Sequence, residues 1–359
     1  MPLPSKASNA VLAKARALYG RRLVQQDYAR LAACRTMTEL AAALKALPLY
    51  APALAGVNPV FAHRTQLEAQ LRQSIFDRYD SLCRFDMSAG DSVYRYFSLS
   101  CEVDEIMTCL RCIDSGSPDE YLFKLPDFLQ QRTVVDLYKL AHATDLPGLM
   151  HALAGTPYAK LLAPLLRPSA ETARGLLVQA EPLLQDYRHK ALVALAPGTQ
   201  ASAYRAQPGV RQYIELECDV AALSNAARLI RMHAPVQTVS AAARRDCTAL
   251  SAAQWQDLLA SRDVPAFKQV LGNTPYGPQL AKYQYGVLKE GLQKYQYDWC
   301  RKWLRFSTDP TLVMLCYVFL ARSEVVNLNH IIEGIHYAMP ADAILPLLVG
   351  CEQTEGSVN

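Results

Sequence analysis

Three acidic residues recur at one position of an internal repeat, and they are the first candidates for chemistry. Glu102, Asp219 and Glu324 each precede apolar residues that stand four, eight and eleven positions further along the chain. These intervals place the apolar side chains on one face of a helix. Ion-carrying carboxylates of membrane proteins sit in long apolar spans, which these acids lack. We therefore predict that the three acids lie near helix starts or on solvated helix faces.

Cysteine and histidine are the other residue types that could form a site. The chain has ten Cys and seven His, but the closest cysteines, Cys109 and Cys112, have no second CxxC and no HxxxH to complete a zinc site. His330 and His336 are six residues apart, so they face different sides of a helix. We predict reduced thiols in helix cores and no catalytic, cofactor-binding or metal-binding residues. A helical enzyme with a Cys/His site remains an alternative.

Motifs of nucleotide-binding and hydrolytic enzymes are absent. The sequence has no GxxxxGK[ST] phosphate loop, no HExxH and no GxSxG. The formal charge of +4 is spread along the 359 residues without a basic tail, so nucleic acid is not an expected partner. The N-terminus has no apolar run of signal-peptide length, which predicts a cytosolic protein. The longest apolar run, Leu312–Ala321, falls short of the ~20 residues of a membrane span and predicts a buried core helix.

A fourteen-residue stretch recurs and indicates which elements position these residues. DLPGLMHALAGTPY at 145–158 matches DVPAFKQVLGNTPY at 263–276 in the same register. In each copy the Asp can cap a helix that has Pro in its first turn, and Gly155 or Asn273 can end that helix in the left-handed conformation. The following Thr-Pro can start the next helix. Both copies therefore predict a helix–turn–helix corner.

A degraded first copy precedes these two. Thr36 and Glu39 form a capping-box pattern, and the helix that follows runs into Leu47-Pro-Leu-Tyr50. We predict that the corner tyrosines pack their rings and hydrogen-bond their hydroxyls, which locks each corner. These tyrosines are Tyr50, Tyr158 and Tyr276.

The repeat extends beyond the corner. A second tyrosine stands 29 positions after the first in two copies, as Tyr79 and as Tyr187, and the acid-led helices follow. Strand signals are scarce. The sequence thus predicts an all-α fold of three similar helical lobes, with residues 1–128, 129–245 and 246–359, in a pseudo-threefold arrangement.

One helix of the third copy carries an unusual mixture of aromatic and basic residues. The run Tyr295–Phe306 has Tyr and Trp at amphipathic spacing with cations between them. Such a helix can lie near a lipid headgroup surface or a partner. A core helix whose long cations cover apolar surface is the favoured interpretation.

The repeated motifs resemble a known family, the C subunit of bacterial and archaeal V/A-type ATPases, called d in eukaryotic V-ATPases. The resemblance rests on Leu-x-x-Thr-Pro-Tyr at Leu153–Tyr158 and Leu271–Tyr276, and on the terminal segment Glu324–Gly334, which is similar to the family's Glu-x-x-Asn-Leu-x-x-Ile pattern. It covers roughly residues 12 to 350. The chain departs from the family's pattern at Leu47–Tyr50, lacks Asn beside Glu102, and has Asn329 where the family often has Arg.

This resemblance implies a funnel-shaped, non-catalytic body of three helical domains. It implies a subunit of the central rotor stalk that receives the end of the shaft from the ATP-hydrolysing head and sits on the membrane rotor ring. The partners would be shaft and ring subunits, with the membrane reached only through the ring, and no cofactor is implied. The sequence does not distinguish H⁺ from Na⁺ as the transported ion. A helical scaffold that binds peptides is a second alternative.

Overall fold

The computed structural model describes residues 6–83, 90–123, 129–130, 133–166, 176–194, 208–243 and 247–351. Its regular structure in these ranges is helical, with no strand, which confirms the predicted all-α class. The α-helices are α1 Lys6–Gly20, α2 Gln25–Ala32, α3 Met37–Lys45, α4 Arg64–Cys83, α5 Gly90–Asp114, α6 Glu120–Phe123, α7 Leu137–Ala141, α8 Leu146–Ala152, α9 Pro157–Leu162, α10 Leu176–Val193, α11 Pro208–Arg231, α12 Val236–Ala242, α13 Ala252–Leu259, α14 Val264–Gly272, α15 Gly277–Leu280, α16 Leu288–Phe306, α17 Pro310–His336 and α18 Ala341–Ile344. The 3-10 helices whose bounds lie within the described residues are η1 Pro59–Phe61, η3 Ala163–Leu166 and η4 Leu345–Leu347.

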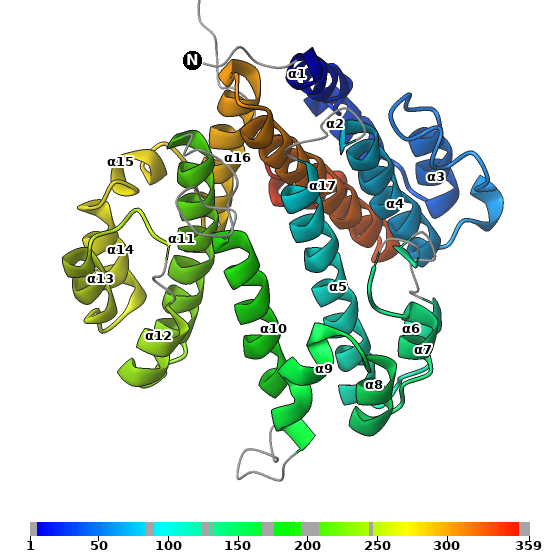
Figure 1. Ribbon diagram of the computed structural model, residues 1–359. Helices are drawn as coiled ribbons and strands as arrows, with labels where there is room; N and C mark the ends of the chain where they lie inside the picture. The colour runs from blue at the N-terminus through cyan, green and yellow to red at the C-terminus, as the bar shows by residue number, and fades with distance from the viewer. Residues whose placement is uncertain are drawn as a thin grey trace, which may run out of the picture.

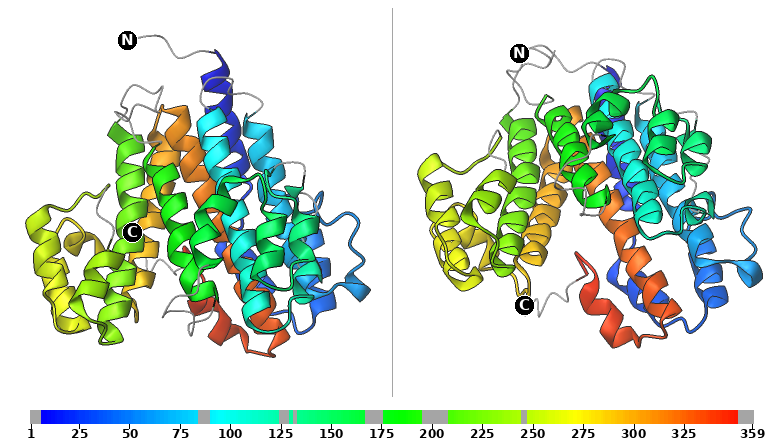
Figure 2. Two further views of the ribbon diagram at one scale, coloured as in Figure 1. Left: turned by 60° about the horizontal axis from the view of Figure 1, so that its bottom comes forward. Right: turned by 90° about the horizontal axis from the view of Figure 1, so that it is seen from below.

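Long helices form the inside of the molecule, and short helices lie outside them (Figure 1). Among the long helices, α5 packs on α10, α11 packs on α16, and α17 packs on α16, α4 and α1. The short helices α13–α15, α6–α8 and α2–α3 lie in separate places on the periphery, and the two views of Figure 2 show the same division. Each of the three acid-bearing helices, α5, α11 and α17, is thus an inner helix.

Helix α17 is central because its sequence is apolar on most sides. Asp309 caps its N-terminus by accepting the N–H groups of Thr311 and Leu312, and Pro310 fills the first helical position. Of the described helices, α17 alone is long and apolar enough to cross a bilayer, but 78% of its apolar window is buried inside the protein. The run Leu312–Ala321 is therefore part of a core helix, as predicted.

The two intact corners have the predicted caps. Asp145 accepts the N–H of Gly148 at 2.8 Å and starts α8, and Asp263 accepts that of Ala266 at 2.8 Å and starts α14. Gly155 has a φ of 82°, the left-handed conformation that favours glycine. The expectation for Asn273 was wrong, because its φ is −89°, and α15 begins after Tyr276 rather than at the proline.

The first copy keeps its helix start and loses the second helix of the corner. Thr36 accepts the N–H of Glu39 at 3.1 Å and caps α3, while the Glu39 carboxylate accepts the N–H of Arg35 instead of that of Thr36. Residues 46–56 form turns, so the Leu47–Tyr50 segment is not followed by a helix. Both predicted lobe boundaries, at 128 and 245, fall outside the described residues.

Candidate functional site

Each of the three repeated acids accepts a hydrogen bond from one corner tyrosine. The hydroxyl of Tyr158 lies 2.6 Å from Glu102, and that of Tyr276 lies 2.6 Å from Asp219. All three acids are buried, with exposed fractions of 5%, 0% and 7% in chain order. The prediction of helix-start or solvated acids was therefore wrong, because periodicity marks the apolar face but cannot show that a polar partner arrives from another helix.

The third acid pairs with the first corner. The hydroxyl of Tyr50 donates to Glu324 at 2.5 Å, although the two residues are 274 positions apart. The predicted role of the corner tyrosines, a buried ring with a bonded hydroxyl, is confirmed at all three positions. The degraded sequence of the first corner thus keeps the same polar contact, and the contact joins α17 to the segment that follows α3.

A backbone N–H completes each of these sites. The donors belong to the segments just before α7, α13 and α2: Val134 to Glu102 at 2.9 Å, Ala249 to Asp219 at 2.9 Å, and Leu23 to Glu324 at 2.8 Å. We call each set of an inner-helix acid, a corner tyrosine and a backbone N–H a carboxylate clamp. Each clamp fastens one segment of short helices to an inner helix at two points, because two donors from different places meet on one carboxylate.

The three clamps differ in their further partners. Asp219 also accepts the hydroxyl of Thr248 at 2.5 Å. Glu324 has the guanidinium of the buried Arg78 at 3.9 Å, and Arg78 lies over the ring of Tyr50. Among the described residues, Glu102 accepts hydrogen bonds from Tyr158 and Val134 and from no further donor.

Burial dominates the electrostatics of the clamps. It raises the pKa of Glu102, against the hydrogen bonds from Tyr158 and Val134, and it raises the pKa of Asp219 against three donors. Burial likewise raises the pKa of Glu324, while Tyr50 and Arg78 lower it in part. Since removal from water disfavours a charge, each clamp holds a carboxylate at a cost that its donors offset.

A second tyrosine packs on the corner tyrosine in two copies. Tyr187 meets Tyr158 edge-on, with ring centroids 5.5 Å apart, and Tyr295 meets Tyr276 edge-on at 6.1 Å. Tyr295 is the equivalent that the sequence comparison missed, because its spacing from Tyr276 is shorter than 29 residues. In the first copy Tyr79 is buried and packs on Phe97 at 4.6 Å instead.

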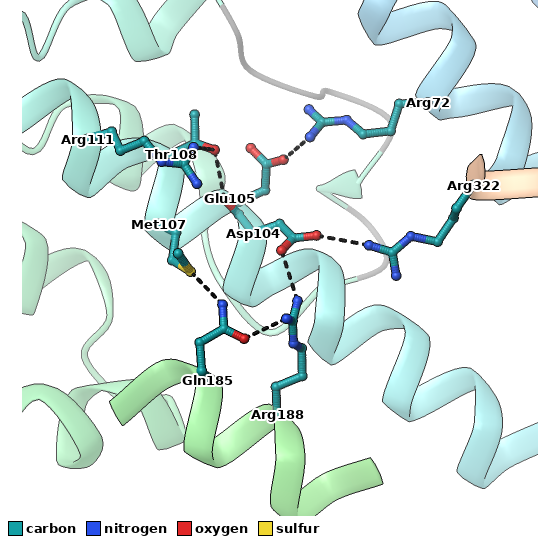
Figure 3. A network of polar contacts seen from close by, with 9 residues as sticks. All are labelled: Arg72, Asp104, Glu105, Met107, Thr108, Arg111, Gln185, Arg188 and Arg322. Atoms are coloured by element: carbon teal, nitrogen blue, oxygen red, sulfur yellow. Dashed lines mark hydrogen bonds and ion pairs between the residues drawn. The ribbon is translucent and has the colours of Figure 1, made fainter. Parts of the chain in front are cut away.

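An ion-pair network joins inner helices of different copies (Figure 3). Asp104 on α5 accepts from Arg188 of α10 at 3.2 Å and from Arg322 of α17 at 3.3 Å. The adjacent Glu105 is buried and pairs with Arg72 of α4 at 2.6 Å. Sequence reasoning missed this network, since charges that meet from separate helices leave no periodic signal.

A cavity of about 860 Å³ lies between α10, α11 and the start of α16. Its charged lining is mainly basic: Arg188, Arg228, Arg231, Lys268 and Lys289 line it, against Glu181 and Glu217. Arg188 is paired with Asp104, and Glu217 accepts a hydrogen bond from Gln296. The excess of cations makes the cavity suited to an acidic partner surface.

The remaining candidates from the sequence are mostly packed side chains. Cys109 and Cys112 are buried on α5, as predicted. In the described part of the chain no group of three or more His, Cys, Asp or Glu could hold a metal ion. The run Tyr295–Phe306 is part of α16, where Cys300 and Leu304 are buried and Trp299 and Trp303 pack against the core, while Phe306 is 73% exposed. One face of this run thus packs into the core while its cations Arg301, Lys302 and Arg305 are exposed, which agrees in part with the favoured interpretation of a core helix.

Comparison with known proteins identifies one family. The family model described as ATP synthase (C/AC39) subunit matches residues 11–346, nearly the whole chain. A search of curated proteins finds no match.

Proposed function

This chain belongs to the ATP synthase (C/AC39) subunit family, and from that premise we propose that it is the central-stalk (rotor) subunit of a V/A-type ion-translocating ATPase or ATP synthase. In this role it couples the rotating shaft to the membrane rotor ring and catalyses no reaction itself. Its partners are the shaft subunits of the ATPase head and the ring subunits. It resides in the cytoplasm and reaches the membrane only through the ring, and it binds no nucleic acid.

The observation that carries this proposal is the threefold repetition of the carboxylate clamp. A part that transmits torque needs a stiff body, because any sliding of one helix past another would dissipate the rotation. The clamps at Glu102, Asp219 and Glu324 fasten peripheral segments to inner helices by directional bonds in a dry interior. The Asp104 network adds bonds between inner helices.

We place three helical lobes around a common axis, in a funnel, as part of the same proposal. The three equivalent clamps support it, since each has one inner helix and one group of short helices. The Glu324–Tyr50 contact joins segments that the sequence boundaries put in the third and first lobes. We therefore propose that α17 is the inner helix of the lobe that contains α2 and α3. A small-angle scattering envelope without three lobes would contradict this arrangement.

The basic cavity is our candidate contact for the shaft. It lies between inner helices, and Arg228, Arg231, Lys268 and Lys289 give it a positive field. An acidic shaft end would be attracted to it, and the contact would weaken with salt.

The experiment separates ATP hydrolysis from ion transport. Membrane vesicles from cells that lack the chain should hydrolyse ATP at the head but show no ATP-driven uptake of H⁺ or Na⁺. Wild-type chain added back should restore uptake, and the double variant R228E/R231E should not. Lys282→Glu, at an exposed lysine outside the cavity lining, is the matched charge-reversal control and should restore uptake.

Two outcomes would contradict the proposal. Ion uptake that is unchanged without the chain would refute a coupling role. Co-purification that recovers neither shaft nor ring subunits with the wild-type chain, in mild detergent, would refute the assigned partners. Full restoration by R228E/R231E would refute only the cavity as the shaft contact.

A further inference from the structure

Two free cysteines lie beside the Asp219 clamp. Cys218 precedes Asp219 on α11, and Cys247 precedes Thr248 and Ala249, which are two of the three residues that donate to Asp219. The bonds from Thr248 and Ala249 bring Cys247 beside α11, close enough to Cys218 for each thiol to shift the pKa of the other. The residue after Cys218 is the clamp carboxylate Asp219, and the two residues after Cys247 bind that carboxylate. These hydrogen bonds therefore hold the two cysteines next to each other.

The two thiols have different surroundings. Cys247 is half-buried, whereas Cys218 is buried with an exposed fraction of 3%. The neighbouring Cys218 lowers the pKa of the Cys247 thiol, and Arg211 acts in the same direction, against burial and Glu215. The same pairing raises the pKa of Cys218. Cys247 is therefore the thiol that ionises first and meets solvent.

A base and an access route lie on the other side of the pair. The Sγ of Cys218 is 3.6 Å from Nδ1 of His189 on α10, and both residues line the 860 Å³ cavity. A small solute that enters the cavity thus reaches Cys218 and His189 together. The imidazole nitrogen can accept the thiol proton when Cys218 reacts.

We propose that Cys218 and Cys247 are a reversible oxidation site that forms a disulfide when the chain meets a small peroxide such as hydrogen peroxide. The thiolate of Cys247 attacks one peroxide oxygen, the O–O bond breaks, and the departing oxygen leaves as water after taking up a proton. This gives a sulfenic acid at Cys247. Cys218 then passes its proton toward His189 and attacks that sulfur, so the S–S bond forms and the sulfenic oxygen leaves as a second water. Both sulfurs are oxidised and the peroxide is reduced.

Another cysteine pair of the chain serves as an internal comparison. Cys300 on α16 and Cys316 on α17 also lie near each other in the packing of these two helices, and Cys316 contributes to the raised pKa of Cys300, but both have an exposed fraction of 0%. They lack solvent contact, and oxidation would need the α16–α17 packing to open. The site is thus set apart by a half-buried thiol and a cavity, and not by the nearness of two cysteines alone. A disulfide between Cys218 and Cys247 would also link the segment 247–249 to α11 covalently.

The test uses the full-length reduced chain and hydrogen peroxide at a few equivalents, followed by thiol blocking, proteolysis and mass spectrometry. We expect a loss of two hydrogen atoms from the intact mass, a linked pair of peptides containing Cys218 and Cys247, and full reversal by dithiothreitol. The oxidised chain should melt at a higher temperature than the reduced chain. The variant C300S should behave as the wild type, and C218S should accumulate a dimedone-trapped sulfenic acid at Cys247.

Several results would overturn the inference. These are a wild-type chain whose Cys218 and Cys247 stay reduced while other thiols react, a Cys247 that proceeds to sulfinic acid without a link, or an equal link yield at Cys300 and Cys316. Because the wild-type chain is itself the decisive sample, a variant that fails to fold leaves the test intact. The readout is independent of any rotary complex, so its failure would not bear on the coupling role.

Discussion

Removing the hydroxyl of Tyr158 tests whether the carboxylate clamps hold the molecule together. Tyr158→Phe keeps the ring, which is 1% exposed and packs on Tyr187, and deletes the 2.6 Å bond to Glu102. The lost bond is made to a carboxylate, so its removal should cost about 1.5–3 kcal/mol of unfolding free energy. We expect the upper end of that range, because the N–H of Val134 would be the one donor left to the buried Glu102 among the described residues.

The same substitution at the other clamps gives an ordered series. Tyr276→Phe leaves Asp219 with Thr248 and Ala249, so the cost should fall near the lower end, about 1.5 kcal/mol. Tyr50→Phe leaves Glu324 with Leu23 and the nearby Arg78, and its cost should lie between those of the other two. Tyr138→Phe, at a half-exposed ring, is the matched control and should change stability by less than about 0.5 kcal/mol.

Urea unfolding at neutral pH, followed by circular dichroism, would measure the series. A chain of this length can unfold in more than one step, so hydrogen exchange at the Val134 amide should accompany it and should speed up in Tyr158→Phe alone. If Tyr158→Phe unfolds at the same urea concentration as Tyr138→Phe, the clamps do not stabilise the fold. If Tyr276→Phe proves the most costly, the count of remaining donors is the wrong basis for the order.

Two further changes address the charge in the clamps. Burial raises the pKa of Glu102 in the folded chain, so the native state holds this proton more tightly than the unfolded chain. The tighter binding of this proton stabilises the folded chain fully at a pH below the ordinary pKa of a carboxyl group. That stabilisation is lost as the pH rises through the raised pKa of Glu102. The variant Glu102→Gln has no such proton, so its stability should change less with pH over this range. Arg78→Met should cost about 3 kcal/mol, since it leaves Glu324 without its cation. The double variant Arg78→Met/Glu324→Gln should recover most of that loss. If the costs of the two single variants simply add in the double variant, the Arg78–Glu324 pair at 3.9 Å is not coupled.

The sequence predicted the elements better than the contacts between them. Cap residues such as Asp145 and Asp263 act on backbone groups a few positions away, so their effect could be derived locally. The corner tyrosines could also be recognised, because a repeated aromatic residue after Thr-Pro has a packing role in each copy. The prediction for Asn273 was wrong because asparagine also adopts a negative φ, here −89°, as well as the left-handed conformation.

The buried acids could not be placed from the sequence, for a physical reason. Whether an acid such as Glu324 is solvated or buried depends on a donor from another part of the chain, here Tyr50, 274 positions away. A helical pattern of residues shows which side chains share a face of one helix. It contains no information about which residues of other helices pack against that face. One signal was available: the three acids and the three corner tyrosines recur in the same number, and a repeated polar residue beside a repeated apolar face favours a shared partner.

The choice of carboxylates at these buried positions has a mechanical explanation. An apolar side chain of similar volume would avoid the cost of burying a charge, so stability alone does not require Glu102, Asp219 or Glu324. An apolar contact, however, tolerates small displacements along a helix, because its energy depends on area and not on direction. A carboxylate that is satisfied only when a tyrosine hydroxyl and a backbone N–H both reach it loses those bonds when either donor slides away. We infer that the clamps fix the relative position of inner helices and peripheral segments, which is the property that the proposed coupling role requires.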